Sequence, residues 1–172
     1  MHETTEAFAE LARSYCAWAE HPPAGHPSAE VVVALDHLLR LSVAALHLPQ
    51  GEGSEEEVES NSHEEWRRIY DRFRSLPIDF YYKVFDPLVE LDDELVGGTL
   101  ADDLADIHRD LQRGLVLYDR GDMEGAAWEW GFHFRAHWGK HATAAIYALQ
   151  SWWADNYFDE VEVNSSDGSR SV

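Results

Sequence analysis

The stretch Thr99 to Tyr118, TLADDLADIHRDLQRGLVLY, repeats apolar residues at the spacing of one helical face. These residues fall three or four positions apart, the period of an amphipathic helix, and they are Leu100, Leu104, Ile107, Leu111, Leu115 and Tyr118. Thr99 can cap the helix, and Asp102 and Asp103 in the first turn suit the positive end of the helix dipole. The stretch therefore predicts a long helix with one face against a core.

The other side of this predicted helix is charged, with Asp102, Asp106, Arg109, Asp110 and Arg113. Pairs such as Asp106 with Arg109 contribute only a few tenths of a kcal/mol each when they are exposed. We therefore expect this side to be solvated. Asp103 projects to the edge of the buried face, beside the apolar row.

Further helices are predicted on both sides of this stretch, and each has a recognisable boundary. Two prolines end the first helix, a capping box from Ser62 to Glu65 begins the third, and Gly121-Asp122 precedes the last. Apolar periodicity places these helices at about 4–20, 28–46, 62–77 and 121–155. The prediction is an all-α fold, a single-domain antiparallel bundle of four to five main helices.

Residues 78–98 fit this pattern least well. Their aromatic and β-branched residues, from Phe80 to Phe85, favour a strand locally. Because a lone strand would have no partner in a helical chain, we interpret the segment as irregular or as a single helical turn, with Asp86-Pro87 as a turn and Gly97-Gly98 as a break.

Two polar segments complete the domain organisation. Residues 49–61, PQGEGSEEEVESN, hold one large apolar residue among their glutamates, so burial cannot offset the entropy of ordering them. We predict a mobile acidic loop there, inside a single domain of residues 1–163. Residues 164–172, NSSDGSRSV, are predicted to be a disordered polar tail.

Charge and cysteine content limit the partners and the compartment. The 172 residues include 33 Asp and Glu against 13 Lys and Arg, a formal net charge of -20. Such a chain repels phosphate groups, so nucleic acid and anionic membranes are not expected partners, whereas a protein with a basic surface is one. The lone Cys16, with no signal peptide and no apolar run of membrane-spanning length, predicts a cytoplasmic protein.

Four polar residues in the last predicted helix recur every fourth position: Glu129, His133, His137 and His141. Residues at this spacing lie along one line of a helix. Projection at 100° per residue puts His137 and His141 on either side of Trp130, within the apolar stripe, so both are expected to be buried. Asp103 is the expected partner of one of them.

Two interpretations of this histidine pair remain open. In the first, His137 and His141 are hydrogen-bonded core residues that fix the register of two helices. In the second, they bind a divalent metal such as Zn²⁺ or Fe²⁺ together with Asp103, and Asp106 or Glu129 complete the site. No catalytic residue can be named, because the chain has no ExxH pair, phosphate-binding GxxxxGK[ST] loop, GxSxG elbow or CxxC pair.

Two motifs, TLADDLADI at 99–107 and HWGKH at 137–141, are similar to those of a bacterial family, the domain of unknown function 5063 family. The likeness extends to LARSYC at 11–16 and VFDP at 84–87. It implies an all-helical bacterial cytoplasmic protein and supplies no activity, substrate or cofactor. His108 departs from the family pattern, where Tyr is expected. The residues that match are Asp102, Asp103, Asp106, Glu129, Trp130, His137, Trp138, Gly139 and His141.

The sequence thus supports two functions of different classes. The leading hypothesis is a non-enzymatic interaction or adaptor domain without a cofactor, which follows from the acidic composition and the absence of catalytic motifs. The alternative is a metal-binding enzyme or sensor with a His/Asp site between the helix that begins at Thr99 and the last long helix.

Overall fold

The computed structural model describes residues 2–23, 25–54, 58, 62–84, 88 and 95–167, and it describes side chains as far as residue 156. Its helices are α1 (His2–Glu20), α2 (Pro27–Ala45), α3 (His63–Phe73), α4 (Leu100–Asp119), α5 (Met123–Ala136) and α6 (Trp138–Asp167). Two short strands, β1 (Phe80–Val84) and β2 (Leu95–Thr99), lie between α3 and α4. The fold is predominantly helical, as predicted.

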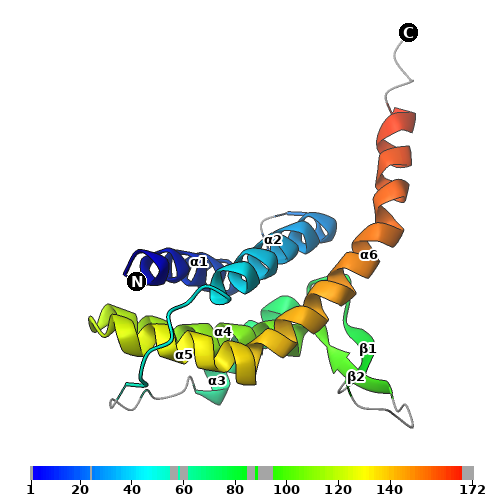
Figure 1. Ribbon diagram of the computed structural model, residues 1–172. Helices are drawn as coiled ribbons and strands as arrows, with labels where there is room; N and C mark the ends of the chain where they lie inside the picture. Colours follow the sequence, from blue (N-terminus) through cyan, green and yellow to red (C-terminus); the bar gives the residue numbers. More distant parts are fainter. Residues whose placement is uncertain are drawn as a thin grey trace.

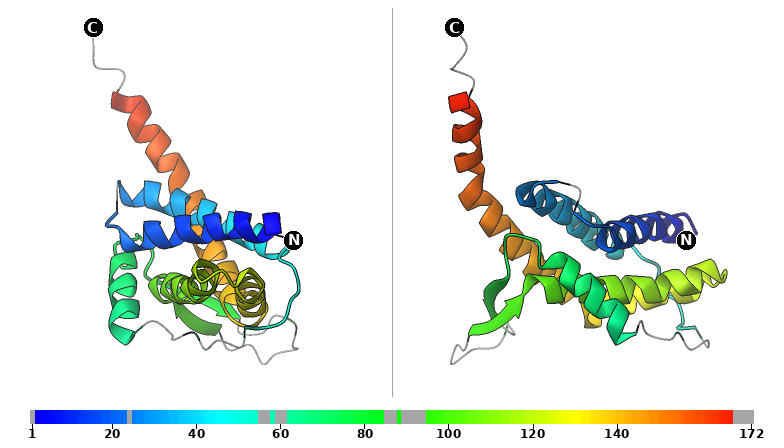
Figure 2. Two further views of the ribbon diagram at one scale, coloured as in Figure 1. Left: turned by 90° about the vertical axis from the view of Figure 1, so that its left-hand side faces the viewer. Right: turned by 180° about the vertical axis from the view of Figure 1, so that it is seen from behind.

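The helices form two layers (Figure 1). The helices α1 and α2 lie side by side in one layer, and α4, α5 and the first half of α6 form the other. The central helix is α4, which packs against α1, α3, α5 and α6. Both rotated views show α3 along one flank and the second half of α6 rising beyond the α1–α2 layer (Figure 2). Because α4 is surrounded on several sides, its polar residues meet other elements.

Large aromatic side chains fill the space between the layers. Trp130 and Trp138 are fully buried, as their helical phase predicted, and the ring of Phe8 from α1 lies 4.9 Å from that of Trp130. Each indole has a hydrogen-bond acceptor, since Trp130 Nε1 donates to the Leu111 carbonyl and Trp138 Nε1 to the Trp130 carbonyl. The core therefore ties α5 and α6 to α4 through both packing and polar contacts.

The segment expected to be irregular forms a β-hairpin instead. Strands β1 and β2 pair antiparallel, with Tyr81 opposite Gly98 and Tyr82 opposite Gly97. The interpretation as an irregular segment was therefore wrong, because the stretch interpreted as a break at Gly97-Gly98 is the partner strand. Gly97 suits the hairpin because the ring of Phe80 lies over it and would collide with a side chain there. The proposed turn at Asp86-Pro87 lies outside the described residues.

The last helix was expected to run unbroken from Gly121 to about Asp155, and this prediction was wrong. It is interrupted at His137, whose φ of −144° and ψ of −83° are not helical. Lys140 donates its backbone N–H to the His137 carbonyl, which starts α6 in a new direction. Gly139 permits the turn because a Cβ there would lie 2.1 Å from the Phe134 carbonyl oxygen. The break changes the direction in which His137 and His141 project.

Parts of the two segments expected to lack order are described by the structure. Val58 is buried, and a side chain added at Gly53 would meet the Trp128 ring at 3.3 Å. Residues 55–57 and 59–61 of the expected mobile loop lie outside the described residues. The helix α6 continues to Asp167, so it includes the start of the segment 164–172, and residues 168–172 are not described.

Two further findings concern the lone cysteine and membrane-spanning segments. Cys16 is buried, and burial followed by the nearby charge of Glu20 raises the pKa of its thiol, so it is held as an unreactive thiol. Across the described part of the chain, no helix combines the length and the apolar character needed to cross a membrane.

Candidate metal centre

A row of three aspartates on α4 faces the junction of α5 and α6. Asp103, Asp106 and Asp110 are spaced by three and four residues, which places them on one face of the helix. Asp103 and Asp110 are buried, and the side chain of Asp106 is 13% exposed. The expectation that Asp106 and Asp110 belong to a solvated face was therefore wrong, because α3, α5 and α6 cover this side of α4.

The break at His137 brings two imidazoles opposite this row. His137 lies at the junction of the two helices and His141 one turn into α6, and their ring centroids are 4.7 Å apart. The side chains of His137 and His141 are 36% and 20% exposed, so the expectation that both are buried was wrong. The turn moves them out of the apolar stripe and leaves them reachable from solvent.

Each imidazole uses its Nδ1 atom to bind a different aspartate. His141 Nδ1 lies 2.6 Å from Asp103 Oδ1, and His137 Nδ1 lies 2.6 Å from Asp110 Oδ2. An ionised carboxylate can only accept a hydrogen bond, so Nδ1 donates in both pairs. In a neutral imidazole the other ring nitrogen, Nε2, then carries a free lone pair.

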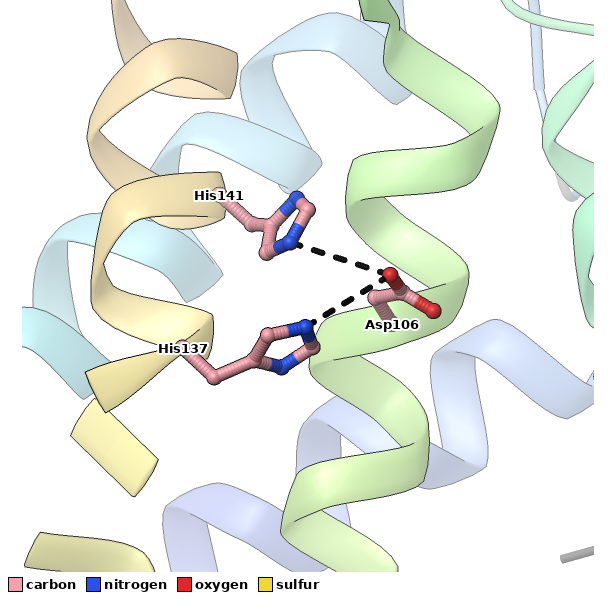
Figure 3. Close-up of side chains that lie close together, drawn as sticks. All are labelled: Asp106, His137 and His141. Atoms are coloured by element: carbon pink, nitrogen blue, oxygen red, sulfur yellow. Dashed lines mark ion pairs between the residues drawn. The ribbon is translucent and has the colours of Figure 1, made fainter. Parts of the chain in front are cut away.

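Both Nε2 atoms face one oxygen atom of Asp106 (Figure 3). Asp106 Oδ2 lies 3.9 Å from His137 Nε2 and 3.7 Å from His141 Nε2, and the three atoms lie within 4.8 Å of one another. Two ligands of a tetrahedral zinc ion, each about 2.1 Å from it, are about 3.4 Å apart. A small inward movement of the three side chains would therefore bring them to ligand distance.

The second oxygen of Asp106 is held from two other directions. Trp66 Nε1, from α3, donates to Asp106 Oδ1 at 2.8 Å, and the guanidinium of Arg109 lies 2.9 Å from the same atom. These contacts fix the carboxylate and leave Oδ2 directed at the two histidines. Sequence reasoning assigned Asp106 to solvent because Trp66, which covers it, is 40 residues away along the chain.

The β-hairpin supports the other end of the row. The hydroxyl of Tyr81 donates to Asp103 Oδ2, while Lys83 Nζ lies 3.5 Å from Asp103 Oδ1. Asp103 Oδ1 thus contacts both the His141 ring and Lys83, while Asp103 Oδ2 accepts from Tyr81. The expected contact between Asp103 and one of the two histidines is present, at His141. Asp103 binds the Nδ1 atom of His141, however, so it does not join the three-residue cluster that Asp106 forms with the Nε2 atoms of His137 and His141.

Glu129 and His133 form a neighbouring pair and do not join the three-residue cluster. Glu129 Oε1 lies 3.2 Å from His133 Nε2 and also accepts from Arg113 Nε on α4. His133 Nδ1 is 3.9 Å from Asp110 Oδ2. Glu129, a candidate ligand from the sequence, is therefore occupied by Arg113 and His133. Asp110 is a residue of the site that sequence reasoning missed. Its spacing from Asp103 and Asp106 is the signal that indicates the shared face.

Local charges shift the pKa values of several groups here. Burial by itself lowers the pKa of His141, but the hydrogen bond to Asp103 and the charges of Asp103 and Asp106 outweigh it, and the pKa is raised. The hydrogen bond to Glu129 raises the pKa of His133 despite burial. Burial, then the charges of Asp106 and Asp103, raise the pKa of Asp102. Negative charge therefore dominates the electrostatics of the site.

Known proteins share this fold. The crystal structure of protein BF1032 from Bacteroides fragilis superposes with a TM-score of 0.70 at 24% sequence identity, covering 86% of this chain and 93% of that one. This likeness concerns the fold alone. No curated protein matches the sequence. A family described as a domain of unknown function, DUF5063, matches residues 1–155, a range that includes every residue of the cluster, and the chain belongs to that family.

Proposed function

We propose that this protein binds a divalent transition metal, Zn²⁺ or Fe²⁺, through Asp106 Oδ2, His137 Nε2 and His141 Nε2. The observation that carries the proposal is the arrangement of both imidazoles. Each directs Nε2 at one shared carboxylate oxygen, while its Nδ1 donates to a separate aspartate. Histidines that bind metals commonly donate their other ring N–H to a carboxylate in this way, which fixes the tautomer and the ring orientation.

The competing interpretation, a purely structural histidine pair, accounts for less of this geometry. A structural role explains the two Nδ1 contacts, since each buried aspartate gains a donor. Without a metal, the convergence of both Nε2 atoms on Asp106 Oδ2 requires protonated imidazoles in ion pairs, because 3.7 and 3.9 Å exceed the length of a hydrogen bond. A shared ion between the three atoms gives the convergence a physical reason.

Charge balance supports a bound cation. With neutral histidines, the carboxylates of the region exceed its cations by two negative charges, a difference that a divalent ion matches. Two protons, one on each of two histidines, would balance the same charge, so metal and protons compete for the site. The groups are Asp102, Asp103, Asp106, Asp110 and Glu129 against Lys83, Arg109 and Arg113.

The ligand number favours a reactive site over a closed structural one. Structural zinc sites use four protein ligands, whereas catalytic zinc sites use three and leave a position for water or substrate. Two histidines and one carboxylate are also the ligand set of many Fe²⁺ enzymes. Because the His137 side chain is 36% exposed, an external ligand can reach the ion. We therefore propose a metal-dependent enzyme or sensor, in which the ion would activate water or bind a small ligand.

The deciding experiment is metal analysis of protein purified without a histidine tag. We expect about one equivalent of Zn or Fe per chain after expression in metal-supplemented medium, and tetrahedral or five-coordinate absorption bands when the metal-free protein is titrated with Co²⁺. Asp106→Asn, His137→Ala and His141→Ala should each remove both signals. His47→Ala, at an exposed histidine outside the cluster, is the matched control. Folded wild-type protein that takes up no Co²⁺ would refute the proposal.

A second candidate function is the non-enzymatic interaction domain expected from the acidic composition. The observation in its favour is a row of large exposed apolar side chains on α2 and at its C-cap, including Leu39, Val43 and Leu46. The two functions are compatible, since this face and the cluster lie on different helices. For either function we propose a cytoplasmic location, supported by the buried free thiol of Cys16.

A further inference from the structure

The outward face of α2 carries an apolar row with coiled-coil spacing. Val32, Leu39 and Val43, together with Leu46 at the C-cap of α2, are 50%, 50%, 59% and 71% exposed, although their residue types are usually buried. Together with Asp36 they fall at intervals of four, three, four and three residues. This alternation keeps side chains on one narrow stripe and is the spacing by which two helices pack against each other. In Figure 1, α2 lies beside α1 in the layer that packs on α4, α5 and α6, and its buried residues form the opposite face.

We propose that the α2 helices of two copies pack antiparallel across this row and form a two-fold symmetric dimer. A two-fold interface must be self-complementary, so that residue i meets residue j while j meets i. The row satisfies this condition from Asp36 to Leu46, and Val32 lies beyond the overlap of the two helices. In an antiparallel pair centred between Leu39 and Val43, Leu39 of each copy lies against Val43 of the second copy. Asp36 then lies opposite Leu46.

The charge distribution favours a second copy at this face. With a formal net charge of -20, two copies repel each other over most of their surfaces. The outward face of α2 is an exception, because its charged residues, Asp36 and Arg40, form an ion pair at 3.2 Å and compensate each other. Glu30, the other acidic residue of α2, points inward, where it contacts Arg72 and Trp18. Two copies therefore approach at this face without bringing net charge together.

The size of the apolar face on α2 limits how tightly two copies are expected to associate. The 19 residues of α2 span about 28 Å at 1.5 Å per residue, and one helix face of that length buries less than the roughly 800 Å² per partner of a standard interface. Asp36, which lies within the apolar row, lowers the stability of the dimer further and restricts the register in which the two helices pack. We expect a weak dimer with a dissociation constant on the order of micromolar.

Sedimentation velocity of the full chain, from about 1 to about 500 µM, tests the proposal. The wild type should shift from one chain to two over this range. Leu39→Glu should remain a single chain throughout, because it places a charge on each side of the seam. Asp36→Leu should associate at least tenfold more tightly, since it completes the apolar row. Leu88→Glu, at an apolar residue that is 93% exposed elsewhere, is the control and should behave as the wild type.

Several outcomes would overturn the dimer. A wild type that stays monomeric across the range, or a Leu39→Glu variant that associates like the wild type, excludes this face as the interface. An Asp36→Leu variant with unchanged association excludes the proposed seam. Circular dichroism and thermal unfolding show whether each variant is folded, and all variants should bind Co²⁺ as the wild type does. Loss of the dimer is therefore distinguishable from loss of the metal site.

Discussion

His141 donates its Nδ1 proton to the buried carboxylate of Asp103, across 2.6 Å, and this contact turns the opposite ring nitrogen toward Asp106. The same relationship is repeated one turn away between His137 and Asp110. The buried aspartates thus orient the imidazoles, and Asp106 supplies the third side chain of the cluster. The proposed division between residues that bind the metal and residues that orient its ligands can be tested by separate substitutions.

Asp103→Asn should weaken metal binding without abolishing it. The amide keeps the volume of the carboxyl and can still accept from His141, but it removes the charge that orients and polarises the ring. Loss of such a partner typically costs 10- to 100-fold in metal affinity. Competition with a chelating dye measures the change. Asp119→Asn, near the other end of α4 and outside the cluster, is the control, and equal affinities for both variants would contradict the orienting role.

The stabilisation that metal confers should increase with pH. The pKa values of His141 and His133 are raised in the folded protein, so their contribution to the stability of the metal-free protein is present below their unfolded value of 6.5 and is lost as pH rises through the folded value. Metal binding has the opposite dependence, because it requires neutral imidazoles. Thermal unfolding should be measured between pH 5.5 and 8.5, with Zn²⁺ and with EDTA. The melting temperature with Zn²⁺ should exceed that with EDTA by an amount that increases as pH rises. A difference between the two melting temperatures that does not change with pH would argue against histidine ligands.

Replacing residues 49–61 by a short Gly/Ser linker should lower the melting temperature, contrary to what their composition suggests. The change removes buried Val58 and exposes the ring of Trp128 that lies against Gly53. A loss of about 2 kcal/mol corresponds to about 4 to 8 °C for a chain of this size. Val58→Ala in the intact segment should reproduce part of the loss. An unchanged melting temperature in both would mean that the contacts do not contribute to stability.

Trp138→Ala should be among the most destabilising single substitutions. Its indole is fully buried at the start of α6, and its Nε1 donates to the Trp130 carbonyl. Removing a buried aromatic of this size costs about 3 to 5 kcal/mol. Phe132→Ala, at a ring that is 42% exposed on α5, is the comparison and should cost about 1 kcal/mol or less. Urea unfolding followed by circular dichroism gives both values, and a near-neutral Trp138→Ala would exclude it from the core.

The helices and the core could be predicted from the sequence because their signals are local. The apolar row of α4, the capping box of α3 and the phase of Trp130 and Trp138 are each contained in one short stretch. Burial of an amphipathic face follows from its period alone. For the same reason the sequence identified His137 and His141 as candidates, since their spacing places them one turn apart.

Only the tertiary structure decided which residues meet at the site. The β-hairpin pairs a stretch that favours a strand locally with Leu95–Thr99, whose two glycines do not, so local propensity could not identify the partner strand. Asp106 faces the histidines because Trp66 and Arg109 hold its other oxygen. The histidines face Asp106 because the chain turns at His137, where Gly139 allows a close backbone approach. Sequence periodicity fixes the face of a helix on which a side chain lies, but what covers that face depends on packing between elements distant in the chain.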